Sequence, residues 1–209
     1  MKKLLTLFLI LGSLLYAIST ENILALSWQN GFCKVHPRNP ACLNRHRGDY
    51  SLTNFTLHGL WPKKEYCAYK PMNLDKRFMK ILEKFMPAAK FGLAKHEWKK
   101  HGVCFGTDAK TYFLTSIKLT QQFNESLFRQ FFVMHMGQSV SLQRLRMIFR
   151  DVFGKGNSRK FQLVCEDGYI TEIRINLKGD PVKKDLYELI DSAKEMHKKQ
   201  CQRGIIALP

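Results

Sequence analysis

Apolar and polar residues alternate along several short stretches of the chain, and this two-residue period predicts β-strands. Alternation predicts a strand over residues 22–28, and β-branched and aromatic residues before Pro62 predict another over residues 55–61. Residues 160–165 and 169–177 are predicted strands as well. Asp167-Gly168 lies between the last two, and this dipeptide favours a tight turn, so these strands are expected to form a hairpin. A short apolar stretch from Ile205 to Leu208 closes the chain.

Elsewhere, apolar residues recur every three or four positions, which is the period of a helix with one buried face. The predicted helices cover residues 74–85, 93–102, 109–122 and 142–153, with a highly charged one over 185–198. Residues 31–49 are rich in Pro, Asn, Arg and Gly and are predicted to form a long loop. Helices in the middle and strands at both ends predict an α+β fold, a single domain with a central, mainly antiparallel sheet flanked by helices.

The first residues have the layout of a secretory signal peptide. Lys2 and Lys3 give a positive start, residues 4–15 are almost wholly apolar, and small residues follow at Ala17 and Ser19. A membrane anchor is the alternative, but the apolar run is shorter than the roughly 20 residues that a spanning helix needs. We therefore expect residues 1–19 to be removed, leaving residues 20–209 as a soluble, monomeric domain that is periplasmic or secreted.

Six cysteines remain after this cleavage. They are Cys33, Cys42, Cys67, Cys104, Cys165 and Cys201. An even number of cysteines in an exported chain favours disulfide bonds, because oxidising compartments allow them to persist. Spacing alone does not choose among the possible pairings. A zinc site is the competing interpretation, but the sequence contains no Cys-x-x-Cys pair.

The net charge of the chain limits the classes of molecule that it is expected to bind. There are 34 Lys and Arg against 17 Asp and Glu, and loss of Lys2 and Lys3 leaves a net charge of about +15. Such an excess attracts polyanions over long range and gains free energy by releasing their counterions. Nucleic acids, anionic lipids and acidic glycans all meet this description, so the charge indicates a polyanionic partner without identifying it.

The segment His96-Glu97-Trp98-Lys99-Lys100-His101-Gly102 gathers chemically active side chains. At about 100° per residue, His96, Glu97, Lys100 and His101 share one face of the predicted helix. An exposed helix with an ordinary Glu97–Lys100 ion pair is the alternative. The histidines lie five residues apart, not four as in zinc-binding His-Glu-x-x-His, so we expect no metal.

His58 lies on a predicted strand and is followed by Gly59. A lone histidine on a strand is more often structural than catalytic. Glycine beside it, however, allows another group to approach the backbone closely.

Together these segments resemble a known family. Phe55-Thr56-Leu57-His58-Gly59-Leu60-Trp61-Pro62 and His96 to Gly102 are similar to the two active-site signatures of the ribonuclease T2 family. Leu24 to Cys33 resembles the opening strand of that family in its bacterial form. The resemblance implies an α+β fold and an endoribonuclease with low base specificity. It also implies cleavage through a 2′,3′-cyclic phosphate to a 3′-phosphate, without a metal or cofactor.

RNA carries its own nucleophile, the 2′-hydroxyl, so the enzyme needs a base, an acid and stabilisation of a charged phosphorane. By resemblance, His101 is the expected base and His58 the expected acid. Lys100 and Glu97 would flank the phosphorane. The resemblance also suggests substrate-binding residues, with His96 holding the phosphate, Trp61, Tyr66 and Tyr69 contacting one base, and Gln29 contacting its neighbour.

The resemblance also suggests the disulfide pairing. Cys67 would join Cys104 and so fix the two signatures against each other, leaving Cys33–Cys42 and Cys165–Cys201. Two positions depart from the family pattern. Val103 replaces a usual threonine, and Lys63 stands where some relatives carry an aspartate that reads adenine, so adenine preference is not expected.

Two other classes of protein fit the charge and the cysteines. One is an exported cationic RNA-binding protein on the same scaffold without turnover, and the other is a membrane-active basic protein. A protein that only binds has no need of the complete set His58, Glu97, Lys100 and His101, and this set favours the enzyme.

Overall fold

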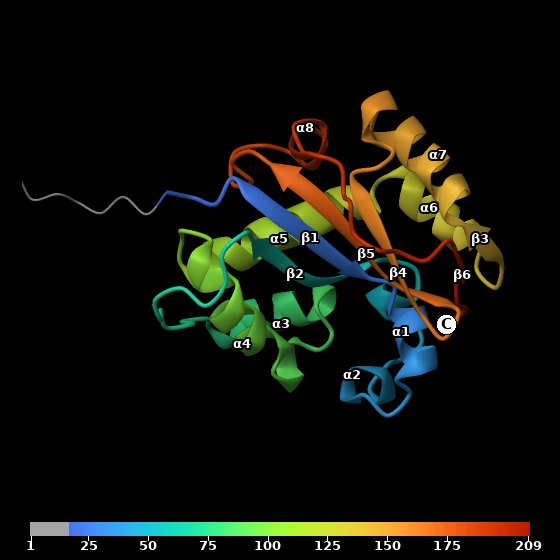
Figure 1. Cartoon of the computed structure of the whole chain (residues 1–209). Coiled ribbons are helices and arrows are strands. Elements are labelled where there is room, and N and C mark those ends of the chain that lie inside the picture. The colour runs from blue at the N-terminus through green and yellow to red at the C-terminus, as the bar shows by residue number, and fades with distance from the viewer. Residues whose placement is uncertain (1–16) are drawn as a thin grey trace, which may run out of the picture.

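The computed structural model describes residues 17–209, which form an α+β fold built on one six-stranded sheet (Figure 1). The strands are β1 (Glu21–Ser27), β2 (Thr56–Pro62), β3 (Ser139–Ser141), β4 (Phe161–Glu166), β5 (Tyr169–Lys178) and β6 (Arg203–Ile205). Their order is β2-β1-β5-β6-β3, with β4 also paired to β5. Only the β5–β6 pair is parallel among these strands. The predicted α+β fold with a mainly antiparallel sheet is therefore confirmed.

Eight α-helices surround the sheet in the described part of the chain. They are α1 (Gln29–Val35), α2 (Pro40–Leu43), α3 (Lys76–Phe85), α4 (Leu93–Lys100), α5 (Ala109–Asn124), α6 (Leu127–Met134), α7 (Leu142–Phe153) and α8 (Leu186–Asp191). In Figure 1, α5 crosses behind β1 and β2, while α3 and α4 lie below β2. The predicted helices at 74–85, 93–102, 109–122 and 142–153 correspond to α3, α4, α5 and α7.

The core is dominated by aromatic rings between the sheet and the helices. Phe123 of α5 packs against Phe128 and Phe153, and Phe128 also contacts Phe161 of β4. All four rings are buried. Helix α6, which supplies Phe128, was not expected from the sequence. Its buried residues Phe128, Phe131 and Phe132 have helical spacing, but the segment LFRQFFVM spans only eight residues and the apolar residues at its two ends are exposed.

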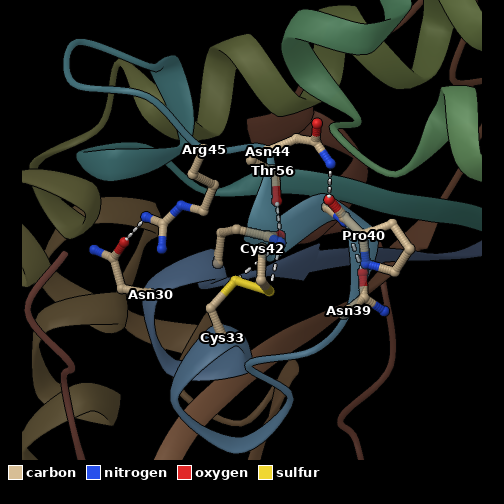
Figure 2. The surroundings of a disulfide bond; sticks show 10 residues. Asn30, Cys33, Asn39, Pro40, Cys42, Asn44, Arg45 and Thr56 are labelled. Carbon is tan, nitrogen blue, oxygen red and sulfur yellow. Dashed lines mark hydrogen bonds between the residues drawn. A yellow bond between two sulfur atoms is a disulfide. The ribbon is translucent and has the colours of Figure 1, made fainter.

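The prediction of a loop over residues 31–49 is wrong in part, because α1 and α2 lie there. Gly31 allows α1 to pack on β5, since a Cβ at this position would lie 1.9 Å from the carbonyl oxygen of Ile170. Asn39 caps α2 by accepting a hydrogen bond from Ala41 N. Figure 2 shows the disulfide that ties the two short helices together. Contacts of this kind stabilise helices that composition alone does not predict.

The predicted charged helix over 185–198 is much shorter, since α8 ends at Asp191. Asp185 and Glu188 begin it with a capping box. Beyond it the chain is held by hydrogen bonds to other segments, such as Met196 N to Arg159 O. The last strand of the chain, β6, ends at Ile205, and the apolar residues from Ile206 onward follow this strand.

The disulfide pairing implied by the family resemblance is confirmed at all three bonds. They are Cys33–Cys42, Cys67–Cys104 and Cys165–Cys201. The bond between Cys67 and Cys104 connects the loop after β2 to the turn after α4.

The predicted signal peptide, residues 1–19, lies outside the described residues except for Ala17 to Ser19. From residue 17 onward, the chain contains no helix that is both long and apolar enough to span a bilayer.

Candidate active site

A β-bulge in β2 presents His58. In the pairing of β1 with β2, Leu26 faces Leu57 and Ala25 faces Gly59, so His58 is the extra residue of the bulge. A bulge interrupts the regular alternation of a strand and re-aims a side chain, and bulges are frequent beside active sites. Here it leaves the His58 side chain 33% exposed at the surface of the sheet.

Both ring nitrogens of His58 face carboxylates. Nδ1 lies 2.5 Å from Oε2 of Glu172 on β5, and Nε2 lies 3.8 Å from Oε1 of Glu97 on α4. Arg174, two residues further along β5, donates a hydrogen bond from Nε to Glu172. Burial by itself lowers the pKa of His58, but the hydrogen bond and charge of Glu172, with the charge of Glu97, outweigh it and raise this pKa. His58 is therefore favoured in its protonated form.

Glu97 is buried directly behind His58, with 1% of its surface exposed. It accepts a 2.7 Å hydrogen bond from Nε1 of Trp61. A Cβ on Gly59 would lie only 2.1 Å from Glu97 Oε2, so glycine permits the close approach expected from the sequence. Burial raises the pKa of Glu97, against the opposing effects of His58, Trp61 and Lys100.

His101 follows α4 and is 3% exposed. Burial, followed by the positive charges of Lys100, His96 and His58, lowers the pKa of His101 to about 3. Its imidazole is thus neutral near pH 7 and can accept a proton. Nδ1 is buried without a hydrogen-bond partner and lies 3.8 Å from Glu65 Oε1.

Trp61 connects the two histidines. Its ring stacks on His101, with centroids 5.4 Å apart, and meets the His58 ring edge-on at 5.2 Å. The guanidinium of Arg174 lies 5.1 Å from the centre of the same indole. Lys100 stands beside His101, and its Nζ lies 3.6 Å from Glu65.

The two histidines open onto different clefts that meet at Arg174. The first has a volume of about 750 Å³ and is lined by Trp61, Lys100 and His101 among others. The second, of about 450 Å³, is lined by His58 and also by His96, Gln29 and Glu172. Arg174 lines both. The four residues predicted to lie on one face of α4 are therefore divided between the two clefts. His96 lines the second cleft, Lys100 and His101 line the first, and Glu97 is buried.

The structure does not bring all the predicted base-binding residues together. Tyr66 and Tyr69 are 61% and 83% exposed, and neither lines either cleft. Gln29 lines the second cleft but is 5% exposed, and its side chain accepts a hydrogen bond from Thr56. The loop after β2 turns Tyr66 outward while its backbone N–H donates to the carbonyl of Lys100.

Glu172 and Arg174 are site residues that the sequence reasoning missed. They alternate along β5 with the buried residues Ile173, Ile175 and Leu177. This alternation was visible in the sequence and indicates one polar face on the strand. Only the pairing of β5 with β1 shows that this face lies beside His58.

The fold and the site together place the chain among proteins of the ribonuclease T2 type. The model of the Ribonuclease T2 family matches residues 20–196, and the chain belongs to that family. Within residues 17–209, no group of three or more His, Cys, Asp and Glu side chains is arranged to hold a metal ion.

Individual relatives agree with this membership. The chain is 31% identical to Ribonuclease I of Escherichia coli (strain K12), across 77% of this chain and 75% of that protein. The self-incompatibility-associated SF11-RNase of Nicotiana alata superposes with a TM-score of 0.64 at 21% identity, covering 90% of this chain and 99% of the other. RNase NT, solved in complex with 5′-AMP, superposes with a TM-score of 0.59 at 15% identity, covering 92% and 99%. At these identities the two superpositions show the fold alone.

Proposed function

We propose that this protein is an exported endoribonuclease that cleaves single-stranded RNA with low base specificity and without a metal. The 2′-oxygen attacks the adjacent phosphorus, the bond to the 5′-oxygen of the next nucleotide breaks, and a 2′,3′-cyclic phosphate forms. Water then opens the cyclic phosphate to a 3′-phosphate. Membership of the ribonuclease T2 family supports RNA as the substrate.

The two histidines divide the proton transfers. Neutral His101 takes the proton of the 2′-hydroxyl at Nε2, and protonated His58 gives its Nε2 proton to the departing 5′-oxygen. In the second step the roles reverse, with His58 accepting a proton from water and His101 returning one to the 2′-oxygen. Each transfer is worth about 10²–10⁴-fold in rate.

The remaining charges act on the phosphate. Lys100 lies in the first cleft beside His101, where its ammonium group offsets the negative charge that grows on the phosphorane. Glu97 holds Trp61 by a hydrogen bond and faces His58 Nε2, so it fixes both rings beside the phosphate. His96, on the wall of the second cleft, is positioned to contact the same phosphate.

One observation carries this proposal, namely that the pKa of His58 is raised while that of His101 is lowered to about 3. Because the pKa of His58 is the higher of the two, the His58 imidazole is protonated while that of His101 is already neutral, which is the state that an acid–base pair needs before the reaction begins.

The test is cleavage of a mixed-sequence RNA by the mature protein in excess EDTA, beside His58→Ala and His101→Ala. We expect the parent to produce cyclic-phosphate ends and each variant to lose about 10²–10⁴-fold in rate. An unchanged rate in either variant would refute the assignment of that histidine. A folded, disulfide-bonded parent that binds RNA but does not cleave it would instead establish the alternative of a cationic RNA-binding protein.

Low base specificity and export are parts of the same proposal. Arg174 and His101 already engage the Trp61 ring, and the exposed Tyr66 and Tyr69 lie outside the clefts, so few groups remain to read a base. Comparable kcat/KM values for dinucleotides that differ only in their bases are expected. N-terminal sequencing of the protein from a periplasmic or culture fraction tests the predicted cleavage near residues 17–19.

A further inference from the structure

A third cavity, of about 350 Å³, continues the second cleft away from the catalytic histidines. It lies between α3 and the segment that contains α2 and the loop after it, and Pro87 and Phe91 line both cavities. Arg174 lines the first and second hollows and Phe91 the second and third, so the three hollows are neighbours, and their order from first to third is here called the path.

Positive charge borders this third cavity. Lys80, Lys84 and Lys90 line it, and all three are exposed. Within residues 17–209 none of them forms a salt bridge. The ammonium of Lys84 lies 5.5 Å from the ring centre of Tyr50, and that of Lys90 lies 5.0 Å from the ring centre of Phe91. These cation–π contacts hold two charges at the rim.

Acidic residues do not cancel this charge. Asp49 and Glu83 also line the cavity, but Asp49 interacts electrostatically with a further cation, Arg45. Arg45 is fixed by a hydrogen bond from its guanidinium to the side chain of Asn30 (Figure 2). The three lysines thus face one remaining carboxylate and are free to neutralise anions that enter from the second cleft.

The direction of an RNA strand along this path follows from the proton transfers. His58 protonates the departing 5′-oxygen, so the departing nucleotide must leave on its side, which is the second cleft. The nucleotide that carries the attacking 2′-hydroxyl lies on the side of His101, in the first cleft. Nucleotides further toward the 3′ end therefore reach the third cavity.

We propose that the third cavity is a subsite for the phosphates of RNA on the 3′ side of the cleaved bond, with Lys80, Lys84 and Lys90 as its binding residues. The subsite recognises the backbone and not the bases, because its charged groups are flexible ammonium ions without a fixed hydrogen-bonding pattern. The inference rests on the proposed ribonuclease function, since the strand direction is taken from the roles of the two histidines.

Two DNA strands of equal length and composition, each with a single ribonucleotide, test the direction. The 3′-tailed strand carries the ribonucleotide near its 5′ end, so a long stretch of DNA follows the cleaved bond. The 5′-tailed strand carries it near its 3′ end, so the long stretch of DNA precedes the cleaved bond. In the triple variant Lys80→Gln, Lys84→Gln, Lys90→Gln, we expect KM for the 3′-tailed strand to rise about tenfold with kcat unchanged. KM for the 5′-tailed strand should stay within about twofold. The slope of log KM against log salt for the 3′-tailed strand should fall by up to about two.

The matched control is Lys110→Gln, Lys155→Gln, Lys183→Gln, which removes the same charge from exposed lysines outside all three cavities. An equal rise in KM for both strands, or the same effect in the control, would mean that only net charge matters and would overturn the subsite. No change in the triple variant would overturn it as well.

Binding measurements separate failure of the subsite from failure of the proposed function. The same strands with a 2′-O-methyl nucleotide at the cleavage position cannot be cleaved, and fluorescence anisotropy gives their affinity. Loss of affinity for the 3′-tailed strand alone supports the subsite even if the parent shows no turnover. A parent that cleaves both strands, with equal affinities in parent and triple variant, leaves the ribonuclease standing and removes the subsite.

Discussion

At the scale of single residues, Glu172 decides the charge of His58. Burial would raise the pKa of Glu172, but its hydrogen bond to His58 and the charges of His58 and Arg174 lower it. The buried carboxylate therefore stays ionised and stabilises a protonated imidazole. Glu172 is a positioning residue, since it acts on the phosphate only through His58.

We predict that Glu172→Gln lowers the pKa of His58. The acid must carry its proton, so activity is lost as pH rises through this pKa, and the alkaline limb of kcat/KM should move to lower pH. A shift of one unit reduces the rate about tenfold at a pH above both values. The pH profile of kcat/KM and an NMR titration of His58 measure it. Glu166→Gln, which removes an exposed carboxylate of the same cleft, is the control and should keep the parental limb.

The fall of kcat/KM at low pH is expected to follow the protonation of His101. Because its pKa is lowered to about 3, it loses its ability to accept a proton only in strong acid. We predict that protonation of His101 does not lower kcat/KM between neutral pH and about pH 4, because His101 is still mostly neutral there. A fall in kcat/KM centred near the ordinary histidine pKa of about 6.5 would show that His101 is not the base.

Gly59 is the glycine at which a methyl group would act most directly on the candidate active site. The added Cβ would lie 2.1 Å from Glu97 Oε2 and 2.4 Å from Trp61 Nε1, so it would separate these two partners. We predict that Gly59→Ala lowers kcat about 10²-fold by displacing the site, and lowers the free energy of unfolding by about 1–3 kcal/mol. Kinetics and denaturant unfolding measure the two effects. Gly156→Ala, whose Cβ meets nothing within 4 Å, should change neither.

At the scale of elements, a bulge and a disulfide bring the two signature segments together. The bulge in β2 re-aims His58, and Cys67–Cys104 joins the segments that carry Glu65 and His101. Cys165–Cys201 closes a segment of nearly the same length, since the sequence separations are 37 and 36 residues. The two bonds therefore restrict the unfolded chain equally but differ in their distance along the chain from the catalytic histidines.

We predict that replacing either pair by alanines lowers the free energy of unfolding by about 4 kcal/mol. Only loss of Cys67–Cys104 should also reduce kcat, by about tenfold, under conditions where both variants remain folded. Denaturant unfolding and kcat at saturating RNA distinguish the two effects. Equal kcat in the two variants would show that this disulfide stabilises the fold without positioning the site.

Elements whose apolar residues recur at a clear period could be predicted from the sequence. Elements stabilised by contacts between residues far apart in the chain could not. From Ile173 onward, β5 alternates between buried and more exposed residues, and α3 and α7 each present a regular apolar face. Helix α1 contains a glycine and resembles a loop until β5 is placed against Gly31. The histidines were found because they belong to family signatures. The support of His58 by Glu172, which lies 114 residues away, depends on strand pairing that no local pattern encodes.

At the scale of the whole molecule, excess positive charge should govern access of RNA but not the chemistry. The chain carries a formal charge of +17, and the proposed cleavage after the signal peptide would leave about +15. This field attracts a polyanion over distances of about 8–10 Å or more, until salt screens it. The proton transfers between buried groups and the bound phosphate are screened far less.

We therefore predict that raising salt from about 50 to 200 mM increases KM for polymeric RNA by at least tenfold, with kcat nearly constant. KM for a dinucleotide should change little, because only one phosphate is neutralised in its complex. Steady-state kinetics on both substrates at several salt concentrations measure these effects. If kcat fell together with the rise in KM, the salt-sensitive charges would act in the transition state. Lys100 and its neighbours, and not the extended path, would then be the main source of the salt dependence.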